Sequence, residues 1–163
     1  LVGYGRVGSL VGASLTEAGL PLVVIEDGDK ALERLRAGGS ETISGNAARP
    51  EVFEAANPEQ ARRVILAIPN AFEAGHIVLR ARAANPAVNI IARAHSDAEV
   101  DHLSGLGADI VIMGEREIAR GIVDAVLRDP TAPPPGGSRG GTNVVEAGFR
   151  PTGDSGDGQP SAA

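Results

Sequence analysis

Three glycines near the start of the chain constrain its fold more than any other feature. Gly3, Gly5 and Gly8 have the spacing Gly-x-Gly-x-x-Gly. The apolar pair before them is typical of the end of a buried strand, and apolar residues at helical spacing follow from Val7 to Leu15. The glycines are therefore expected at a tight turn from a parallel strand into a helix.

Each glycine has its own physical role at such a turn. Gly3 allows the tight turn, Gly5 has no Cβ to block a phosphate near the backbone, and Gly8 lets the helix pack closely on the strand. The free N–H groups at the helix N-terminus favour an anion. A phosphate-binding turn is therefore predicted. The alternative is a glycine-rich turn that binds nothing.

An acidic residue follows the second apolar run. Leu22 to Ile25 predict a buried strand, and Glu26 follows it about 20 residues after the glycine turn. The Glu26 carboxylate can accept hydrogen bonds from ribose hydroxyls, and its charge, with Asp27 and Asp29 nearby, should repel a 2′-phosphate. NAD-type or adenosine ligands are therefore favoured over NADP.

The composition narrows the class of protein. The 163 residues suit one domain, with or without a tail, and only 2% are aromatic, so the core must be aliphatic, as in buried parallel sheets. A net charge of −6 argues against a nucleic-acid partner. Without cysteine there is no disulfide or thiolate site, and the three histidines lack metal-ligand spacing, so no metal is expected.

Strand and helix signals alternate along the rest of the chain. Strands are expected at residues 1–2, 22–26, 41–45, 64–68, 88–92 and 109–113, and helices at 7–15, 30–35, 50–56, 72–84, 98–106 and 115–128. This rhythm predicts an α/β fold: a Rossmann-like, doubly wound parallel sheet of about six strands in the order 3-2-1-4-5-6, with helices on both faces. The ligand crevice then lies between the first and fourth strands, at their carboxyl ends.

Two parts of different character are expected. Residues 1–129 form the nucleotide-binding domain, whereas residues 130–163 are rich in Pro, Gly and Ser and are expected to be a disordered tail. The first strand begins at Leu1, which predicts that it is truncated and that the chain is a piece of a longer protein.

The succession of loops resembles a known family. Residues 3–8 (Gly-Tyr-Gly-Arg-Val-Gly), 23–26 (Val-Val-Ile-Glu) and 45–49 (Gly-Asn-Ala-Ala-Arg) look like the RCK-N or TrkA-N regulatory domain of potassium transport proteins. Further segments resemble the cytoplasmic tail of Kef-type cation/proton antiporters, particularly the YbaL-like branch. These segments are 66–70 (Leu-Ala-Ile-Pro-Asn), 73–75 (Glu-Ala-Gly), 90–95 (Ile-Ile-Ala-Arg-Ala-His) and 113–120 (Met-Gly-Glu-Arg-Glu-Ile-Ala-Arg).

The resemblance implies a regulator rather than an enzyme. In the family, a membrane antiporter domain precedes this one and exchanges potassium or another monovalent cation for protons. The nucleotide domain binds NAD(H) or AMP, and paired domains pass the bound state to the transporter. The resemblance therefore implies a homodimer at the cytoplasmic face of the inner membrane, with a crossing helix at about residues 115–128. The apolar residues of this helix recur at helical spacing from Ile118 to Leu127, and the alternative is a plain helix that covers its own sheet.

The resemblance also marks the residues expected at the cofactor, each of which has a simpler alternative role. Arg6 is placed to reach a phosphate or is merely solvated, Asn46 lies beside the adenosine or forms an Asx turn, and Asn70 lines the crevice or caps a helix. Arg93 matches an arginine of the Kef glutathione site, but the residues after it differ, and a generic anion-facing or salt-bridged arginine is the simpler interpretation. The full set of expected cofactor-binding residues is Gly3, Tyr4, Gly5, Arg6, Val7, Gly8, Glu26, Asp27, Gly45, Asn46, Ala47, Ile68, Pro69, Asn70 and Arg93.

Two other functions remain open at this point. The chain could be a freestanding nucleotide-sensing subunit of a potassium uptake system that docks on a separate membrane partner. It could also be the cofactor half of an NAD-dependent dehydrogenase, which would need a general acid or base from a substrate domain. The loops expected at the crevice supply no catalytic constellation, so no catalytic residue is predicted.

Overall fold

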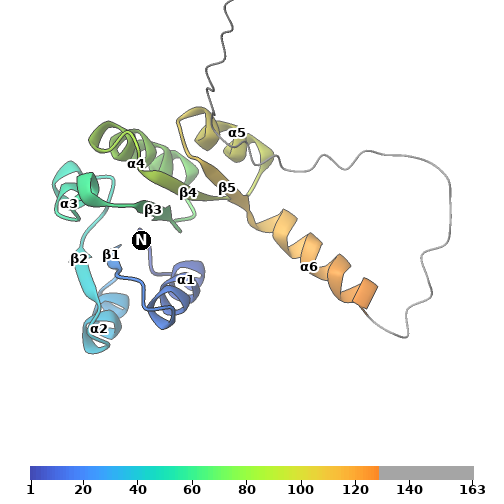
Figure 1. Ribbon diagram of the computed structural model, residues 1–163, viewed down its shortest axis with the longest axis horizontal. Coiled ribbons are helices and arrows are strands. Elements are labelled where there is room, and N and C mark those ends of the chain that lie inside the picture. The colour runs from blue at the N-terminus through green and yellow to red at the C-terminus, as the bar shows by residue number, and fades with distance from the viewer. Residues whose placement is uncertain (129–163) are drawn as a thin grey trace, which may run out of the picture. The chain divides into compact units, whose positions relative to one another are not determined.

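The structure is a computed structural model that describes residues 1–128. Five parallel strands and their connecting helices make up this part of the chain (Figure 1). The strands are β1 (Val23–Glu26), β2 (Glu41–Ser44), β3 (Arg63–Leu66), β4 (Asn89–Ala94) and β5 (Ile110–Met113). The helices are α1 (Arg6–Glu17), α2 (Asp29–Ala37), α3 (Pro50–Glu54), α4 (Ala71–Ala84), α5 (Asp97–Gly105) and α6 (Gly114–Arg128), with a 3₁₀ turn η1 (Pro58–Gln60). The predicted tail, residues 130–163, lies outside the described residues.

Val2 connects two groups of paired strands. β1 pairs with β2, and β4 pairs with both β3 and β5, all in parallel. Val2 bridges Ile25 of β1 and Leu66 of β3, and its N–H donates to the carbonyl of Ile65 at 2.8 Å. Val2 therefore occupies the position of the first of the expected strands, between β1 and β3.

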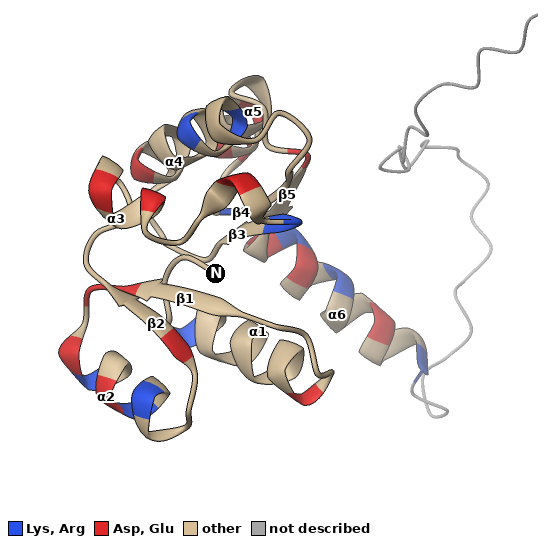
Figure 2. Ribbon diagram, turned by 60° about the vertical axis from the view of Figure 1, so that its left-hand side comes forward, with Lys and Arg blue, Asp and Glu red and all other residues tan. Residues whose placement is uncertain are grey.

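Helices cover the sheet in two layers. Figure 2 shows α1 and α2 together on one side of the strands and α4 and α5 together on the other. Side chains on β4 alternate in burial, with Ile90, Ala92 and Ala94 in the core, as expected for a strand with two different faces. This architecture confirms the α/β, Rossmann-like class predicted from the sequence.

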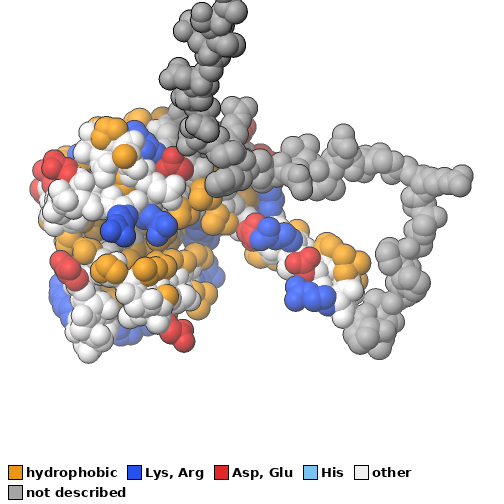
Figure 3. Space-filling view, in the orientation of Figure 1, with side chains coloured by type: hydrophobic (Ala, Val, Ile, Leu, Met, Phe, Trp, Pro, Cys, Tyr) orange, Lys and Arg blue, Asp and Glu red, His pale blue; other side chains and the backbone are white. Residues whose placement is uncertain are grey.

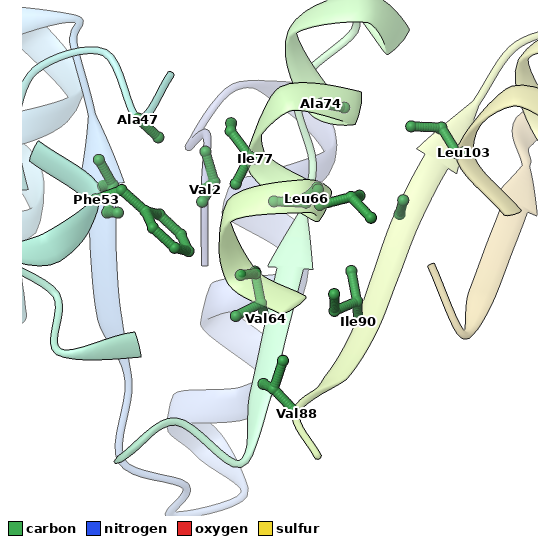
Figure 4. Close-up of a cluster of buried hydrophobic side chains, with 14 of the residues drawn as sticks. Val2, Ala47, Phe53, Val64, Leu66, Ala74, Ile77, Val88, Ile90 and Leu103 are labelled. Carbon is green, nitrogen blue, oxygen red and sulfur yellow. The ribbon is translucent and has the colours of Figure 1, made fainter. Parts of the chain in front are cut away.

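The main core lies between the strands and the layer formed by α3, α4 and α5. Phe53 is its single aromatic side chain, and Leu66, Ile77 and Ile90 of the same cluster are each at most 1% exposed (Figure 4). The remainder is Val, Leu, Ile and Ala, as the low aromatic content predicts. The core therefore fixes α4 firmly against β3 and β4.

Helix α6 packs differently from the other long helices. None of its residues is buried, and it touches the rest of the described chain mainly at β5. An apolar stripe of Ile118, Ile122, Val123, Val126 and Leu127 is exposed, and hydrophobic side chains are visible along the helix in Figure 3. A plain helix covering its own sheet, one of the interpretations open from sequence, is therefore wrong.

Among residues 1–128, no helix combines the length and the apolar character that crossing a bilayer requires.

Candidate functional site

The glycine turn has the geometry that its spacing predicts. Gly3 has φ +86°, a conformation that L side chains rarely adopt, and a Cβ there would lie 2.8 Å from Cγ2 of Ile68. A Cβ on Gly8 would lie 2.0 Å from the carbonyl oxygen of Gly3 and 3.3 Å from Cβ of Ala67. The predicted turn and packing roles of Gly3 and Gly8 are thus confirmed. Gly5 has no neighbouring heavy atom within 4 Å of its Cβ position, so the space beside it is open.

The N-terminus of α1 is electrostatically uncompensated. Its N-cap is Gly5, no side chain caps it, and its first turn holds no acidic residue. By contrast, Asn70 and Ser96 cap α4 and α5, and acidic residues occupy the first turns of α2, α3 and α6. Among the α-helices of residues 1–128, α1 alone leaves both its N–H groups and its positive dipole end available to an anion.

Glu26 ties the second strand to the glycine turn. Its carboxylate accepts hydrogen bonds from the backbone N–H groups of Tyr4, of Gly28 at 2.8 Å and of Asp27 at 3.1 Å. Burial alone raises the pKa of Glu26, but these donors outweigh it and hold that pKa below its ordinary value. The group is therefore an ionised acceptor beside α1, as a ribose-binding acid requires.

Tyr4 belongs to the site through its backbone rather than its ring. A Cβ on Gly12 would lie 2.6 Å from Cε2 of Tyr4, so the ring packs against α1 at that glycine. The backbone N–H of Tyr4 points to Glu26 instead. The short spacing from Gly8 to Gly12 is the sequence signal that could have revealed this packing.

The loop after β2 lies beside Glu26. The N–H of Gly45 donates to the carbonyl of Glu26 at 2.9 Å, and Oδ1 of Asn46 accepts from the N–H of Ala48 at 2.6 Å. The Asx turn that was the alternative role of Asn46 is therefore present. The side chain of Ala47 is 4% exposed and packs in the core, so only its backbone can face the crevice.

The segment after β3 forms the other side of the crevice. Ile68 lies against Gly3, as the distance from its Cγ2 shows, and Pro69 is exposed beside it. Oδ1 of Asn70 accepts from the N–H groups of Phe72 at 3.0 Å and Glu73 at 3.1 Å. The predicted capping role of Asn70 is confirmed, so its side-chain oxygen already has partners.

The two arginines of the predicted set stand apart from these contacts, whereas Asp27 takes part through its backbone N–H. Arg6 and Asp27 are exposed at the edges of the crevice. Arg93 lies on β4, opposite Ile112 in the register and on the face away from the core. Within residues 1–128, no hydrogen bond or ion pair links Arg93 to the glycine turn or to an acidic residue, so neither a cofactor contact nor a salt bridge is shown for it.

Sequence reasoning missed three residues that shape the site. Gly28 donates to Glu26, Ala67 touches the Gly8 position, and Arg80 reaches the carbonyl of Ala48 from α4. A glycine directly after two acids was a usable signal for Gly28. Nothing local marks Arg80, because its partner is 32 residues away in sequence.

Two grooves of the described residues lie outside the crevice. One, of about 530 Å³, is lined by Tyr4, Thr16 and Arg34 between α1 and α2, and the other, of about 720 Å³, lies near Leu1 and Phe53. Neither is lined by Gly5, Glu26 or Asn70. Backbone N–H groups and the Glu26 carboxylate supply the polar groups of the candidate site. Among residues 1–128, no group of three or more His, Asp or Glu side chains could hold a metal ion.

Comparison with known proteins agrees with this geometry. Residues 1–114 match the TrkA-N domain family, which is most of the chain. The chain belongs to the TrkA-N domain family. Over 130 residues this TrkA-N domain is 50% identical to the cation/proton antiporter YbaL of Escherichia coli, a match that covers 80% of the chain but 23% of that protein. The resemblance to the YbaL-like antiporters seen in the sequence is thereby confirmed.

Two solved structures are similar to this TrkA-N domain. The crystal structure of the TrkA-N domain of inner membrane protein YbaL from E. coli superposes with a TM-score of 0.74 at 51% identity, covering 76% of this chain and 92% of that one. The Shewanella denitrificans Kef C-terminal domain in an AMP-bound form superposes with a TM-score of 0.64 at 26% identity, covering 80% of each chain. Relatives of this TrkA-N domain are thus parts of transport proteins, and one of them binds a nucleotide.

Proposed function

We propose that this TrkA-N domain binds an adenine nucleotide, NAD(H) or AMP, in the crevice between the glycine turn and the end of β3. The observation that carries the proposal is the uncompensated N-terminus of α1 beside the open side of Gly5, with the ionised Glu26 carboxylate next to it. A phosphate at the helix end and ribose hydroxyls at Glu26 satisfy both features at once. The AMP-bound Kef relative supports a ligand of this class.

Each side of the crevice has a part in this binding. The N–H groups at the start of α1 hold the phosphate, and the exposed Arg6 adds a charge-assisted contact to it. Asp27 stands beside Glu26, so that a 2′-phosphate meets two negative charges. The Gly45–Ala47 segment presents its backbone to the adenosine. NAD(H) and AMP satisfy these contacts equally, because they share the adenosine monophosphate portion.

The bound nucleotide regulates transport of monovalent cations against protons by a membrane domain. In this proposal, the domain stands at the cytoplasmic face of the inner membrane as part of a longer antiporter, as its likeness to YbaL and to a Kef domain suggests. The chain matches less than a quarter of the length of YbaL, so the transport step belongs to the remainder of such a protein. Ligand binding acts by shifting the population between two arrangements of the regulatory domains.

The regulatory unit is a homodimer that uses α6. The exposed stripe on α6 and the exposed Ile110 and Ile112 of β5, 47% and 45% accessible, give the domain unmatched apolar surface. A second copy can supply matching surface of the same kind, since a two-fold interface pairs one patch with itself. In such a dimer, a change in the sheet on nucleotide binding would move α6 and the partner domain, because α6 follows β5 directly.

Calorimetric titration of the 163-residue chain with AMP and with NADH tests the proposal. Both should bind, and the Gly5→Val variant should lose binding while it stays folded, because its side chain enters open space that the phosphate needs. Gly105→Val is the matched control, since its Cβ position also has no neighbour within 4 Å and it lies on α5, away from the crevice. Failure of the unaltered chain to bind either nucleotide would refute the proposal.

A further inference from the structure

Arg80 reaches from α4 to the loop that carries Asn46. Its Nη2 donates to the carbonyl oxygen of Ala48 at 3.4 Å, which is long for a hydrogen bond. Its Nε is shielded from solvent and has no acceptor among residues 1–128, the only buried side-chain polar atom there without a partner. A buried guanidinium N–H without an acceptor is costly, so its environment calls for an explanation.

The two backbone polar groups of Ala48 are both hydrogen-bonded. Its N–H donates to Oδ1 of Asn46 at 2.6 Å, and its carbonyl accepts from Arg80. The carbonyl of Asn46 in turn accepts from the N–H of Arg49 at 3.1 Å. A shift of the Ala48 carbonyl would therefore also move the Asx turn that holds Asn46 at the crevice.

Helix α4 carries Arg80 and also begins at the loop that forms the opposite side of the crevice. Asn70 caps the start of α4 beside Pro69, and Arg80 projects from the same helix about 15 Å further along its axis. Ala74, Ile77 and Ala81 fix α4 in the core, each at most 1% exposed. Arg80 thus links the loop after β2 to α4, a helix that is fixed in the core and begins at the loop after β3.

We propose that Arg80 is a positioning residue for nucleotide binding, acting through the backbone of Ala48 on the Asn46 turn. This inference rests on the proposed function, because it assigns a role within that site. When a nucleotide binds, the turn draws closer to α4, the 3.4 Å contact shortens, and the Nε–H of Arg80 gains a backbone carbonyl acceptor from the Asn46–Ala48 segment. The hydrogen bond completed in this way adds to the affinity for the nucleotide.

The test is calorimetry of the full chain with AMP as the probe. Arg80→Met should weaken AMP binding roughly tenfold, the effect of one lost charge-assisted hydrogen bond. Arg80→Lys should restore part of that loss, because an ammonium group can still donate to the Ala48 carbonyl. Arg36→Met, on the exposed side of α2, is the matched control and should bind AMP as the unaltered chain does.

A double-mutant cycle separates positioning from a merely structural role. Combining Arg80→Met with Asn46→Ala should cost clearly less than the sum of the two separate losses, since both changes act on one turn. Combining Arg80→Met with Glu26→Gln should be additive, because Glu26 acts on the ribose from another loop. If Arg80→Met caused a general loss of structure, it would instead lower AMP affinity alike in combination with Asn46→Ala and with Glu26→Gln.

Each outcome has a definite meaning. Unchanged AMP affinity in a folded Arg80→Met variant, or a strictly additive cycle with Asn46→Ala, overturns the role of Arg80 and leaves the proposed function standing. If Arg80→Met does not fold, Arg80→Lys carries the same cycle. Absence of AMP and NADH binding in the unaltered chain refutes the proposed function itself, and the inference with it.

Discussion

The carbonyl oxygen of Gly3 lies 2.0 Å from the position that a Cβ on Gly8 would occupy. No side chain fits there without moving the glycine turn or α1, because the clashing atom belongs to the backbone. Gly8→Ala should therefore lower the free energy of unfolding by about 3 kcal/mol or more, as severe overpacking does. Chemical denaturation measures the loss, and Gly105→Ala, which meets open space, should show little change. A Gly8→Ala variant as stable as the parent would contradict this packing.

Glu26 should control the choice between NAD and NADP. Its carboxylate and that of Asp27 place negative charge where a 2′-phosphate would lie. Glu26→Gln should weaken NADH binding several-fold and narrow its advantage over NADPH, because one repulsive charge is removed. Asp101→Asn is the matched control and should leave the ratio unchanged, since Asp101 is exposed on α5, away from the carboxylate contacts. Calorimetry with both cofactors measures the ratio, and an unchanged ratio would exclude Glu26 from the ribose site.

The pH dependence of the fold should also depend on Glu26. Its pKa is lower in the folded chain than its ordinary value of 4.5, because backbone N–H groups stabilise the carboxylate. The contribution of Glu26 to stability is therefore complete above about pH 4.5 and is lost as the pH falls through the lower folded value. Thermal melts of the parent and of Glu26→Gln should differ most near neutral pH and converge in acid. A constant difference down to acid pH would contradict these contacts.

The apolar stripe of α6 should hold a dimer together. Ile122 is 60% exposed at the middle of the stripe, and Ile122→Asp should raise the dissociation constant at least tenfold, because an interface would have to bury the new charge. Gly121→Asp introduces the same side chain on another side of α6 and should have a smaller effect. Sedimentation velocity over a concentration series gives both constants. An unaltered chain that stays monomeric at high micromolar concentration, with or without NADH, would contradict the homodimer.

Arg82 should stabilise the fold without contributing to the nucleotide crevice. Its guanidinium donates to the carbonyls of Pro86, Val88 and Gly107, each at 2.8 Å, and pairs with Asp109 at the same distance. Arg82→Met should cost about 2 kcal/mol, because several backbone acceptors lose their donor together. Denaturation should show this loss while AMP affinity in the folded state stays the same. A parallel loss of affinity would mean that this network reaches the site.

Much of the fold could be predicted because its signals are local. Each buried strand is a short apolar run, and each helix is bounded by glycine, proline or a capping residue, so the elements fall within a few residues of their expected ranges. The strand expected over 64–68 ends at Leu66, although the N–H of Ala67 still donates to the carbonyl of Val2. Spacing alone also indicated the turn at Gly3 and the contact at Gly8.

The rest of the site depends on contacts between distant residues. The sequence favoured no single role for Asn46, since the same side chain suits an Asx turn and a ligand, and only the position of Ala48 shows the turn. Arg80 carried no local signal because its contact spans 32 residues. For α6, periodicity showed an apolar stripe but could not show which surface it meets, since a helix that covers its own sheet has the same pattern.

Val2 bridges the two paired groups of strands, and the glycine turn begins at the very next residue. The crevice therefore opens at the seam between the β1–β2 group and the β3–β5 group. A nucleotide held by Glu26 on one side and by the loop after β3 on the other would act as a cross-brace over this seam. Its binding would then suppress the partial opening in which one group of strands separates while the other stays folded. Such a domain would then sense the nucleotide through a gain in rigidity between the β1–β2 and β3–β5 groups, even where each group keeps its shape.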